Sequence, residues 1–222
     1  GGRAREVTAM NALTVNLPLL MASFFRPEGK RRRILIEAHA FPSDRYAVQS
    51  QLAWHGLDPD ADLIEVQPGT GRRCLQQSEL EAAIREHGEH LALVLLPGVQ
   101  YVTGQAFDLA GLTQAAHEAG APIGFDLAHA VGNIPLALHD SGADFAAWCS
   151  YKYLNGGPGC IAGAFVHERH LDAEHRVKLA GWWANDVNTR FRMSPELDPA
   201  PGVDAWQISN PPILSTAPLL AS

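Results

Sequence analysis

The stretches Pro122-Ile123-Gly124-Phe125-Asp126 and Phe145-Ala146-Ala147-Trp148-Cys149, the second leading into Ser150-Tyr151-Lys152-Tyr153, decide the fold. Both are short apolar runs of the kind that forms strands buried in a sheet. A residue that can do chemistry follows each run: the carboxylate of Asp126 ends the first, and the amine of Lys152 lies just past the second. Because ligands bind at the carboxyl ends of strands in open α/β sheets, we expect these two side chains to share a site.

Similar apolar runs alternate with helical patterns along most of the chain, which predicts an α/β fold with parallel crossovers. We expect strands over 33–37, 62–66, 91–96, 122–126, 145–149 and 160–167, and helices at about 43–55, 78–86 and 109–118. Ser78 and Glu81 have the spacing of a capping box. Gly88 and Gly120 stand where left-handed C-terminal caps belong.

The composition is that of a globular protein with an acidic surface. The chain has 222 residues, 46% hydrophobic content and a formal net charge of -7, which argues against a nucleic-acid surface. One basic run, Lys30 to Arg33, leads into an apolar strand, and we interpret it as a solvated turn. A length of 222 residues is enough to bury a substantial core.

Cysteine usage and hydropathy bear on the compartment. Cys74, Cys149 and Cys160 are an odd number without C-x-x-C spacing, which indicates neither a disulfide framework nor a metal site. No apolar stretch approaches the roughly 20 residues of a membrane helix, and residues 1–10 contain no signal-peptide core. We therefore expect a cytoplasmic protein without a membrane partner.

The pair of Asp126 and Lys152 indicates pyridoxal phosphate. A lysine amine can form an imine with the aldehyde of this cofactor, and a carboxylate can hold the ring nitrogen protonated. An isolated aspartate at a strand end would more simply cap a loop, and an isolated lysine between tyrosines would be a surface residue. Together at the carboxyl ends of two strands, they favour the cofactor.

The chain resembles the kynureninase family over nearly its whole length. The matching segments are 10–17, 41–44, 101–105, 125–165, 190–193 and 208–213. The resemblance implies a PLP-dependent fold type I large domain over residues 1–222, with a mostly parallel mixed sheet and helices on both faces. It also implies that a further N-terminal segment and a small C-terminal domain of the family lie outside this chain.

The resemblance assigns phosphate-binding residues. Leu13 and Thr14 stand at the start of an expected helix, where N–H groups and the helix dipole favour an anion, although Thr14 could be an ordinary cap. Pro18 fits such a helix only within its first turn. Tyr151 is implied to bind the phosphate and to donate a proton late in the reaction. Pro97 departs from family members that have a serine facing the phosphate.

Other family positions would surround the cofactor ring. Phe41 would stack on the ring and Asp44 would lie near its nitrogen, with Pro42 and Ser43 between them; a plain turn with Ser43 or Asp44 as helix N-cap is the simpler interpretation of this segment. His129 would lie beside the cofactor, although such a histidine is often only a core residue. Lys152, Tyr151 and Asp126 are the expected catalytic residues.

Two late positions imply a second subunit. Trp182 and Asn210 match residues that reach across a dimer interface in kynureninases, so the resemblance implies a homodimer with shared active sites. Without the resemblance, Trp182 would be interpreted as a core or interface aromatic residue. The turn at Asn155 to Gly159 lacks the Lys-Ser/Thr of a P-loop.

The implied reaction is the hydrolysis of L-kynurenine, or of 3-hydroxykynurenine, to anthranilate or 3-hydroxyanthranilate and L-alanine in tryptophan catabolism, on the kynurenine pathway to NAD biosynthesis. One alternative is another fold-type I enzyme, either a class V aminotransferase or a cysteine desulfurase. A desulfurase would need a reactive cysteine on a mobile loop and usually has histidine where this chain has Tyr151. The second alternative is a non-catalytic fragment, because the family's carboxylate-binding arginine belongs to the small C-terminal domain.

Overall fold

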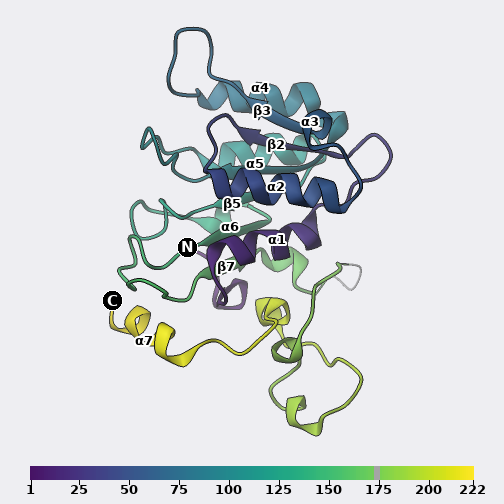
Figure 1. Ribbon diagram of the computed structural model, residues 1–222, viewed down its shortest axis with the longest axis vertical. Coiled ribbons are helices and arrows are strands. Elements are labelled where there is room, and N and C mark those ends of the chain that lie inside the picture. The colour runs from purple at the N-terminus through teal and green to yellow at the C-terminus, as the bar shows by residue number, and fades with distance from the viewer. Residues whose placement is uncertain (173–175) are drawn as a thin grey trace.

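The computed structural model describes residues 1–172 and 176–222, and a seven-stranded sheet forms its centre (Figure 1). The strand order is β1-β7-β6-β5-β4-β2-β3. Strands β2 to β6 run parallel to one another, whereas β7 is antiparallel to β6 and β1 is antiparallel to β7. The strands are β1 Val7–Ala9, β2 Arg33–Glu37, β3 Leu63–Val66, β4 Leu91–Pro97, β5 Ile123–Asp126, β6 Phe145–Trp148 and β7 Gly163–Val166.

Helices connect the parallel strands, and further helices come before β2 and after β7 in the chain. The α-helices are α1 Leu13–Phe24, α2 Pro42–Trp54, α3 Pro59–Asp62, α4 Gln77–His87, α5 Leu109–Glu118, α6 Leu138–Ser141 and α7 Ile213–Ala221. Short 3-10 helices lie at Ala4–Glu6, Gly88–His90, Glu168–His170, Trp182–Ala184, Arg190–Arg192 and Gly202–Trp206. In the described part of the chain, no helix is long and apolar enough to cross a membrane.

Two hydrophobic cores cover the two faces of the sheet, because successive side chains of a strand point to opposite faces. On one face, Leu35 and Val94 pack with side chains of α4 and α5. On the other face, Ile34 and Leu93 pack with side chains of α1 and α2. Burying one such side chain stabilises the fold by about 1.5–3 kcal/mol. The two cores confirm the expected α/β fold with helices on both faces.

The expected strands and helices are confirmed, with small shifts at their ends. Strand β1 was not expected, since three residues are too few for a periodic pattern. The capping box is not at Ser78, which lies inside α4. Instead Glu79 accepts a hydrogen bond of 2.8 Å from the backbone N–H of Gln76. Gly120 has the expected left-handed conformation with φ +73°, but Gly88 has φ -46° because the chain continues into a 3-10 helix.

We expected Pro18 in the first turn of α1, but it lies further into the helix. A proline there removes one helical hydrogen bond at a cost of about 3 kcal/mol. Tertiary contacts offset this cost, because Leu17 and Leu20 are fully buried on either side of it. The carbonyl of Pro18 also accepts a 2.8 Å hydrogen bond from the side chain of Gln51. Packing therefore overrides the local preference.

The basic run forms a turn that leads into β2, whose first residue is Arg33. Within it, the Arg31 guanidinium donates to the carbonyls of Gly88 at 2.9 Å and Ala119 at 3.0 Å. Arg32 pairs with the buried carboxylate of Asp62 at 3.0 Å. Arg31 and Arg32 thus stabilise the fold through these contacts.

Candidate functional site

A small pocket opens where the carboxyl ends of β2, β4 and β5 meet. Asp126 ends β5 and lies in register with Pro97, which ends β4. Glu37 ends β2 in the same region. The residues that line this pocket are Glu37, Phe41, Asp44, Pro97, Val99, Tyr101, Asp126 and His129. The parallel sheet therefore gathers side chains that are far apart in the sequence.

Lys152 follows β6 in a turn and extends to the same site. Its Nζ lies 3.0 Å from Nε2 of His129 and 5.9 Å from the ring centroids of Phe41 and Tyr151. Burial, and then the charge of Lys152, lowers the pKa of the His129 imidazole. A neutral His129 with its proton on Nδ1 can accept a hydrogen bond from the Lys152 ammonium through Nε2. His129 thus holds the amine in place.

Asp126 is buried without an ion pair. Its Oδ1 accepts a 2.7 Å hydrogen bond from the backbone N–H of Ala128, and its exposed fraction is only 7%. Among residues 1–172 and 176–222, no salt bridge to this carboxyl is formed. A buried carboxylate is stable only when a cation or hydrogen bonds compensate it. The site therefore suits a ligand with a positive charge near Asp126.

Two further carboxyl groups lie beside Asp126. Burial, with added repulsion from Asp126 and Glu65, raises the pKa of Glu37 to about 8. Burial and the adjacent Asp126 carboxyl also raise the pKa of Asp44 far above its usual range. Three neighbouring carboxyls cannot all be charged at neutral pH. Asp44 and Glu37 are therefore protonated there, and Asp44 can donate a hydrogen bond to Asp126.

The first turns of α1 and α2 meet at this end of the sheet. The hydroxyls of Thr14 and Ser43 are 3.0 Å apart. Backbone N–H groups in the first turn of a helix have no partner within the helix. Phe41 is the N-cap of α2 and Pro42 is its first residue, so Ser43 and Asp44 lie in the first turn and neither is the N-cap. Hydroxyl and N–H donors from two helices are thus combined, as an anion requires.

Tyr151 lies next to Lys152 and is half-exposed. Burial of its hydroxyl, followed by the neighbouring thiol of Cys149, raises the pKa of the Tyr151 phenol. The phenol is therefore protonated at neutral pH and can donate a proton.

Trp182 and Asn210 are not brought to this site within one chain. Trp182 is half-exposed, and its Nε1 donates to the carbonyl of Arg190 at 3.4 Å. Asn210 is exposed and accepts a 3.4 Å hydrogen bond from Ser209. Both belong to the segment that follows β7 and runs away from α2 and α4 (Figure 1). Their assignment to a shared site remains a prediction.

Sequence reasoning missed Glu37 and Tyr101. Glu37 could have been found, because it ends an apolar strand as Asp126 does. Tyr101 packs edge-on against Phe41, with ring centroids 5.3 Å apart. Only the fold brings the loop after β2, which contains Phe41, next to the loop after β4, which contains Tyr101.

A separate cluster of Glu6, His139 and His167 has the composition of a metal site. Its atoms are already bonded, however. Glu6 Oε1 accepts from His139 Nδ1 and from the backbone N–H of Glu168, both at 2.8 Å, and His167 Nδ1 accepts from the N–H of Arg169. These bonds attach the N-terminal segment to the region around β7.

Comparisons with known proteins identify the family of this chain. The family description "Aminotransferase class-V" matches residues 21–193. The kynureninase of Xanthomonas campestris pv. campestris (strain B100) is 59% identical over 222 residues, which are 100% of this chain and 52% of that protein. The kynureninase of Xanthomonas axonopodis pv. citri (strain 306) is 58% identical with the same coverage. The chain thus spans about half the length of these curated relatives.

Solved structures share the fold at low identity. The cysteine desulfurase of Thermococcus onnurineus NA1 has a TM-score of 0.76 at 20% identity, over 99% of this chain and 51% of that one. The cystine C-S lyase C-DES, solved with cysteine persulfide, has a TM-score of 0.79 at 19% identity, over 98% of this chain and 55% of that one. The chain belongs to the aminotransferase class-V family.

Proposed function

We propose that this member of the aminotransferase class-V family is the cofactor-binding part of a kynureninase, with residues 1–222 forming its large domain. The reaction is the hydrolysis of L-kynurenine, or of 3-hydroxykynurenine, to an anthranilate and L-alanine. The identity of 59% to a Xanthomonas kynureninase supports the substrate class. The observation that carries the proposal is the Lys152 amine, held 3.0 Å from His129 beside Asp126.

The side chains at this site fit pyridoxal phosphate. Asp126 would hold the ring nitrogen, because it is a buried carboxyl that lacks an ion pair among the described residues. Thr14, Ser43 and the first turns of α1 and α2 would hold the phosphate, together with Tyr151. Phe41 would pack on the ring. When bound, the cofactor supplies the electron sink for cleavage of the carbon-carbon bond.

The chain's own residues would position the amine and move protons. Lys152 would bind the cofactor covalently and, once released, would take the proton from the substrate's α-carbon as a neutral amine. His129 would orient Lys152 through the 3.0 Å contact. Asp44, protonated, would donate to Asp126 and leave a single negative charge facing the ring nitrogen.

Tyr151 would act late in the reaction. Water adds to the γ-carbonyl of the substrate and anthranilate leaves. The remaining three-carbon unit needs a proton at its β-carbon to become alanine. The protonated Tyr151 phenol next to Lys152 is the donor we assign to this step.

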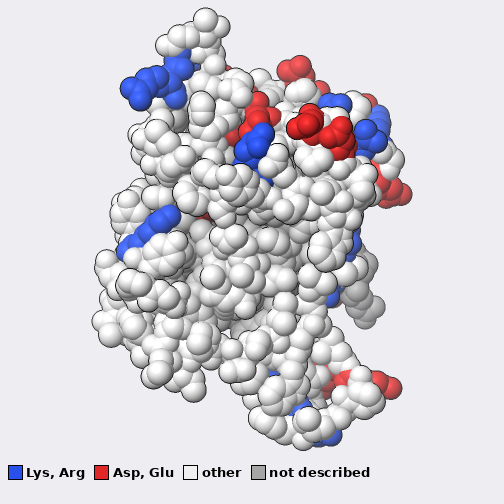
Figure 2. All heavy atoms as spheres, in the orientation of Figure 1, with Lys and Arg blue, Asp and Glu red and all other residues white. Residues whose placement is uncertain are grey.

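We also propose a cytoplasmic homodimer that acts in tryptophan catabolism. Large apolar side chains are exposed in the segment after β7, including Trp182, Phe191, Ile213 and Leu214. In Figure 2, Lys, Arg, Asp and Glu gather mainly over α2 to α4 and at the lower tip, and the area between them is nearly free of charge. Exposed apolar side chains with few charges among them favour association.

A chemical test follows from the lysine content. The chain has three lysines, Lys30, Lys152 and Lys178. Adding pyridoxal phosphate to the purified chain should produce a visible absorption band, and borohydride should then fix the cofactor on Lys152. Peptide mass mapping identifies the labelled lysine, and Lys152→Ala should remain unlabelled. Labelling of Lys30 or Lys178 in its place would refute the site. Release of anthranilate by the full-length enzyme tests the substrate.

Among the described residues, no cysteine lines the pocket at Asp126. Cys149 and Cys160 are buried. Cys74 is exposed, but it lines a different cavity, beyond Tyr101. No observation at the Lys152 site therefore favours sulfur transfer over hydrolysis.

A further inference from the structure

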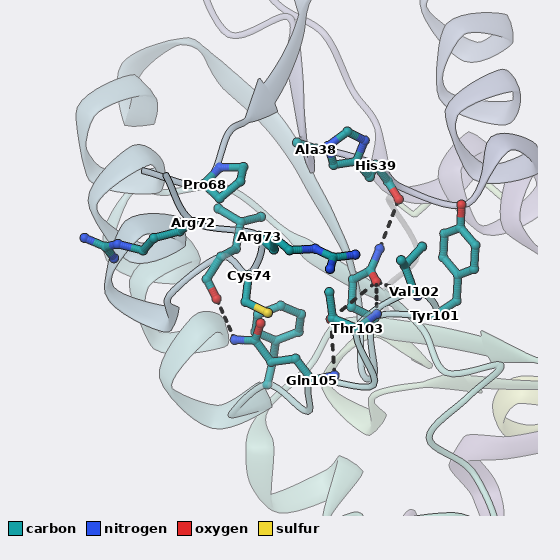
Figure 3. Close-up of a pocket in the computed structure, with 13 residues that line it drawn as sticks. Ala38, His39, Pro68, Arg72, Arg73, Cys74, Tyr101, Val102, Thr103 and Gln105 are labelled. Atoms are coloured by element: carbon teal, nitrogen blue, oxygen red, sulfur yellow. Dashed lines mark hydrogen bonds between the residues drawn. The ribbon is translucent and has the colours of Figure 1, made fainter. Parts of the chain in front are cut away.

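A second cavity opens between the loop after β3 and the loop after β4 (Figure 3). Its volume is about 370 Å³, which lies in the range of pockets for small organic ligands. Its lining includes Pro68, Arg73, Leu75, Tyr101, Val102 and Phe107. Neither Lys152 nor Asp126 lines it, so it is distinct from the proposed reaction site.

Two arginines, Arg72 and Arg73, line this cavity. Figure 3 shows the Arg73 side chain extending across the cavity toward Thr103, whereas the Arg72 side chain extends in the opposite direction. Arg72 pairs with Glu79 at 3.3 Å. Within residues 1–172 and 176–222, no hydrogen bond or ion pair is formed by the Arg73 guanidinium. Since a guanidinium is always charged and presents a planar fork of donors, it suits a carboxylate.

The side-chain amide of Gln100, which also lines this cavity, is already hydrogen-bonded. Gln100 donates through Nε2 to the carbonyl of His39 at 3.0 Å. Its Oε1 accepts from the backbone N–H groups of Val102 at 2.7 Å and Thr103 at 3.0 Å. Gln100 therefore fixes the wall of the cavity instead of offering its amide to a ligand.

The remaining wall is mostly apolar. Leu75 and Phe107 form a buried floor, and Pro68, Tyr101 and Val102 stand around it. Of the two arginines, Arg72 is paired with Glu79, which leaves the Arg73 guanidinium to bind a ligand. A mostly apolar wall with one unpaired guanidinium fits an organic anion with a flat hydrophobic body.

We propose that this cavity binds a small aromatic carboxylate, with its carboxylate on Arg73 and its ring against Phe107 and Val102. The choice of anthranilate as the ligand rests on the proposed function, in which anthranilate is the product. Tyr101 lines both this cavity and the pocket at Asp126, and its ring packs on that of Phe41. A product bound here would therefore contact the aromatic pair that borders Lys152.

The test is a binding titration of the 222-residue chain and anthranilate, in which the fluorescence anisotropy of anthranilate measures binding. Arg73→Gln should weaken binding at least about tenfold, the scale of one lost charged hydrogen bond. Arg72→Gln is the matched control and should bind like the unmodified chain. 2-Aminobenzamide, which lacks the negative charge, should bind at least about tenfold more weakly than anthranilate.

Lys152→Ala separates this cavity from the reaction site. The variant should bind anthranilate with unchanged affinity. Loss of binding in Lys152→Ala with retention in Arg73→Gln would place the ligand at Lys152 and overturn the proposal. Equal weakening in both arginine variants would also overturn it, because it would indicate a nonspecific charge effect. Borohydride labelling of Lys152 does not depend on Arg73, so failure here leaves the proposed function standing.

Discussion

Glu37→Gln should change how the stability of the fold depends on pH. Glu37 is only 3% exposed, and burial and its acidic neighbours raise its pKa from 4.5 to about 8. The folded state therefore holds this proton more tightly than the unfolded chain, and wild-type stability is lost as the pH rises from 4.5 through 8. At about 1.36 kcal/mol for each pKa unit, the full loss is about 5 kcal/mol.

Because neighbouring carboxyls titrate as a group, we expect Glu37 alone to account for only part of this loss, at least about 2 kcal/mol. Gln is close in shape to a protonated Glu but cannot ionise. Glu37→Gln should thus match the stability of wild type to within about 1 kcal/mol at pH 5 and be more stable than wild type by about 2 kcal/mol or more at pH 9.

Urea unfolding followed by circular dichroism at pH 5, 7 and 9 measures this difference. Glu86→Gln is the control, because Glu86 is exposed on α4, and it should show the wild-type dependence on pH. If Glu37→Gln lost stability with rising pH as steeply as wild type, Glu37 would be charged in the fold and the account of the carboxyl cluster would be wrong.

Three further predictions concern the site, the dimer and the core. Asp126→Asn in the full-length enzyme should still bind the cofactor on Lys152 but should lower turnover at least about tenfold, because the ring nitrogen loses its charged partner; unchanged turnover would remove Asp126 from the mechanism. Mixing full-length Lys152→Ala with a Trp182→Ala, Asn210→Ala double variant should restore part of the activity, since one site of each heterodimer is intact. No recovery in heterodimers verified by mass would assign each site to one subunit. Leu17→Ala should lower the free energy of unfolding by about 2–5 kcal/mol in urea, because its side chain is fully buried; a loss under about 1 kcal/mol would contradict the packing of α1.

Local chemistry made part of the site visible in the sequence. Asp126 and Lys152 each follow an apolar run, and parallel strands place such residues at one edge of a sheet. The pairing of β5 with β6 and the contact of Lys152 with His129 agree with that expectation. The roles of Trp182 and Asn210 came only from the resemblance and need a second subunit to test them.

Caps and helix interiors were harder to predict, because competing local signals have similar energies. Ser78 and Gly88 both fit cap patterns, yet α4 begins one residue before Ser78 and the chain continues helically past Gly88. Differences of about 1 kcal/mol separate such alternatives. Contacts elsewhere in the fold decide between them, as they do for Pro18.

The sequence by itself determined the alternation of strands and helices and the positions of Asp126 and Lys152, because periodicity and strand ends are local properties. Only the tertiary structure decided that Glu37 joins Asp126, and that Arg73 faces a cavity while Arg72 faces Glu79. Burial, charge repulsion and the direction of a side chain depend on neighbours that are distant in the chain. They therefore exist only once the sheet has brought those neighbours together.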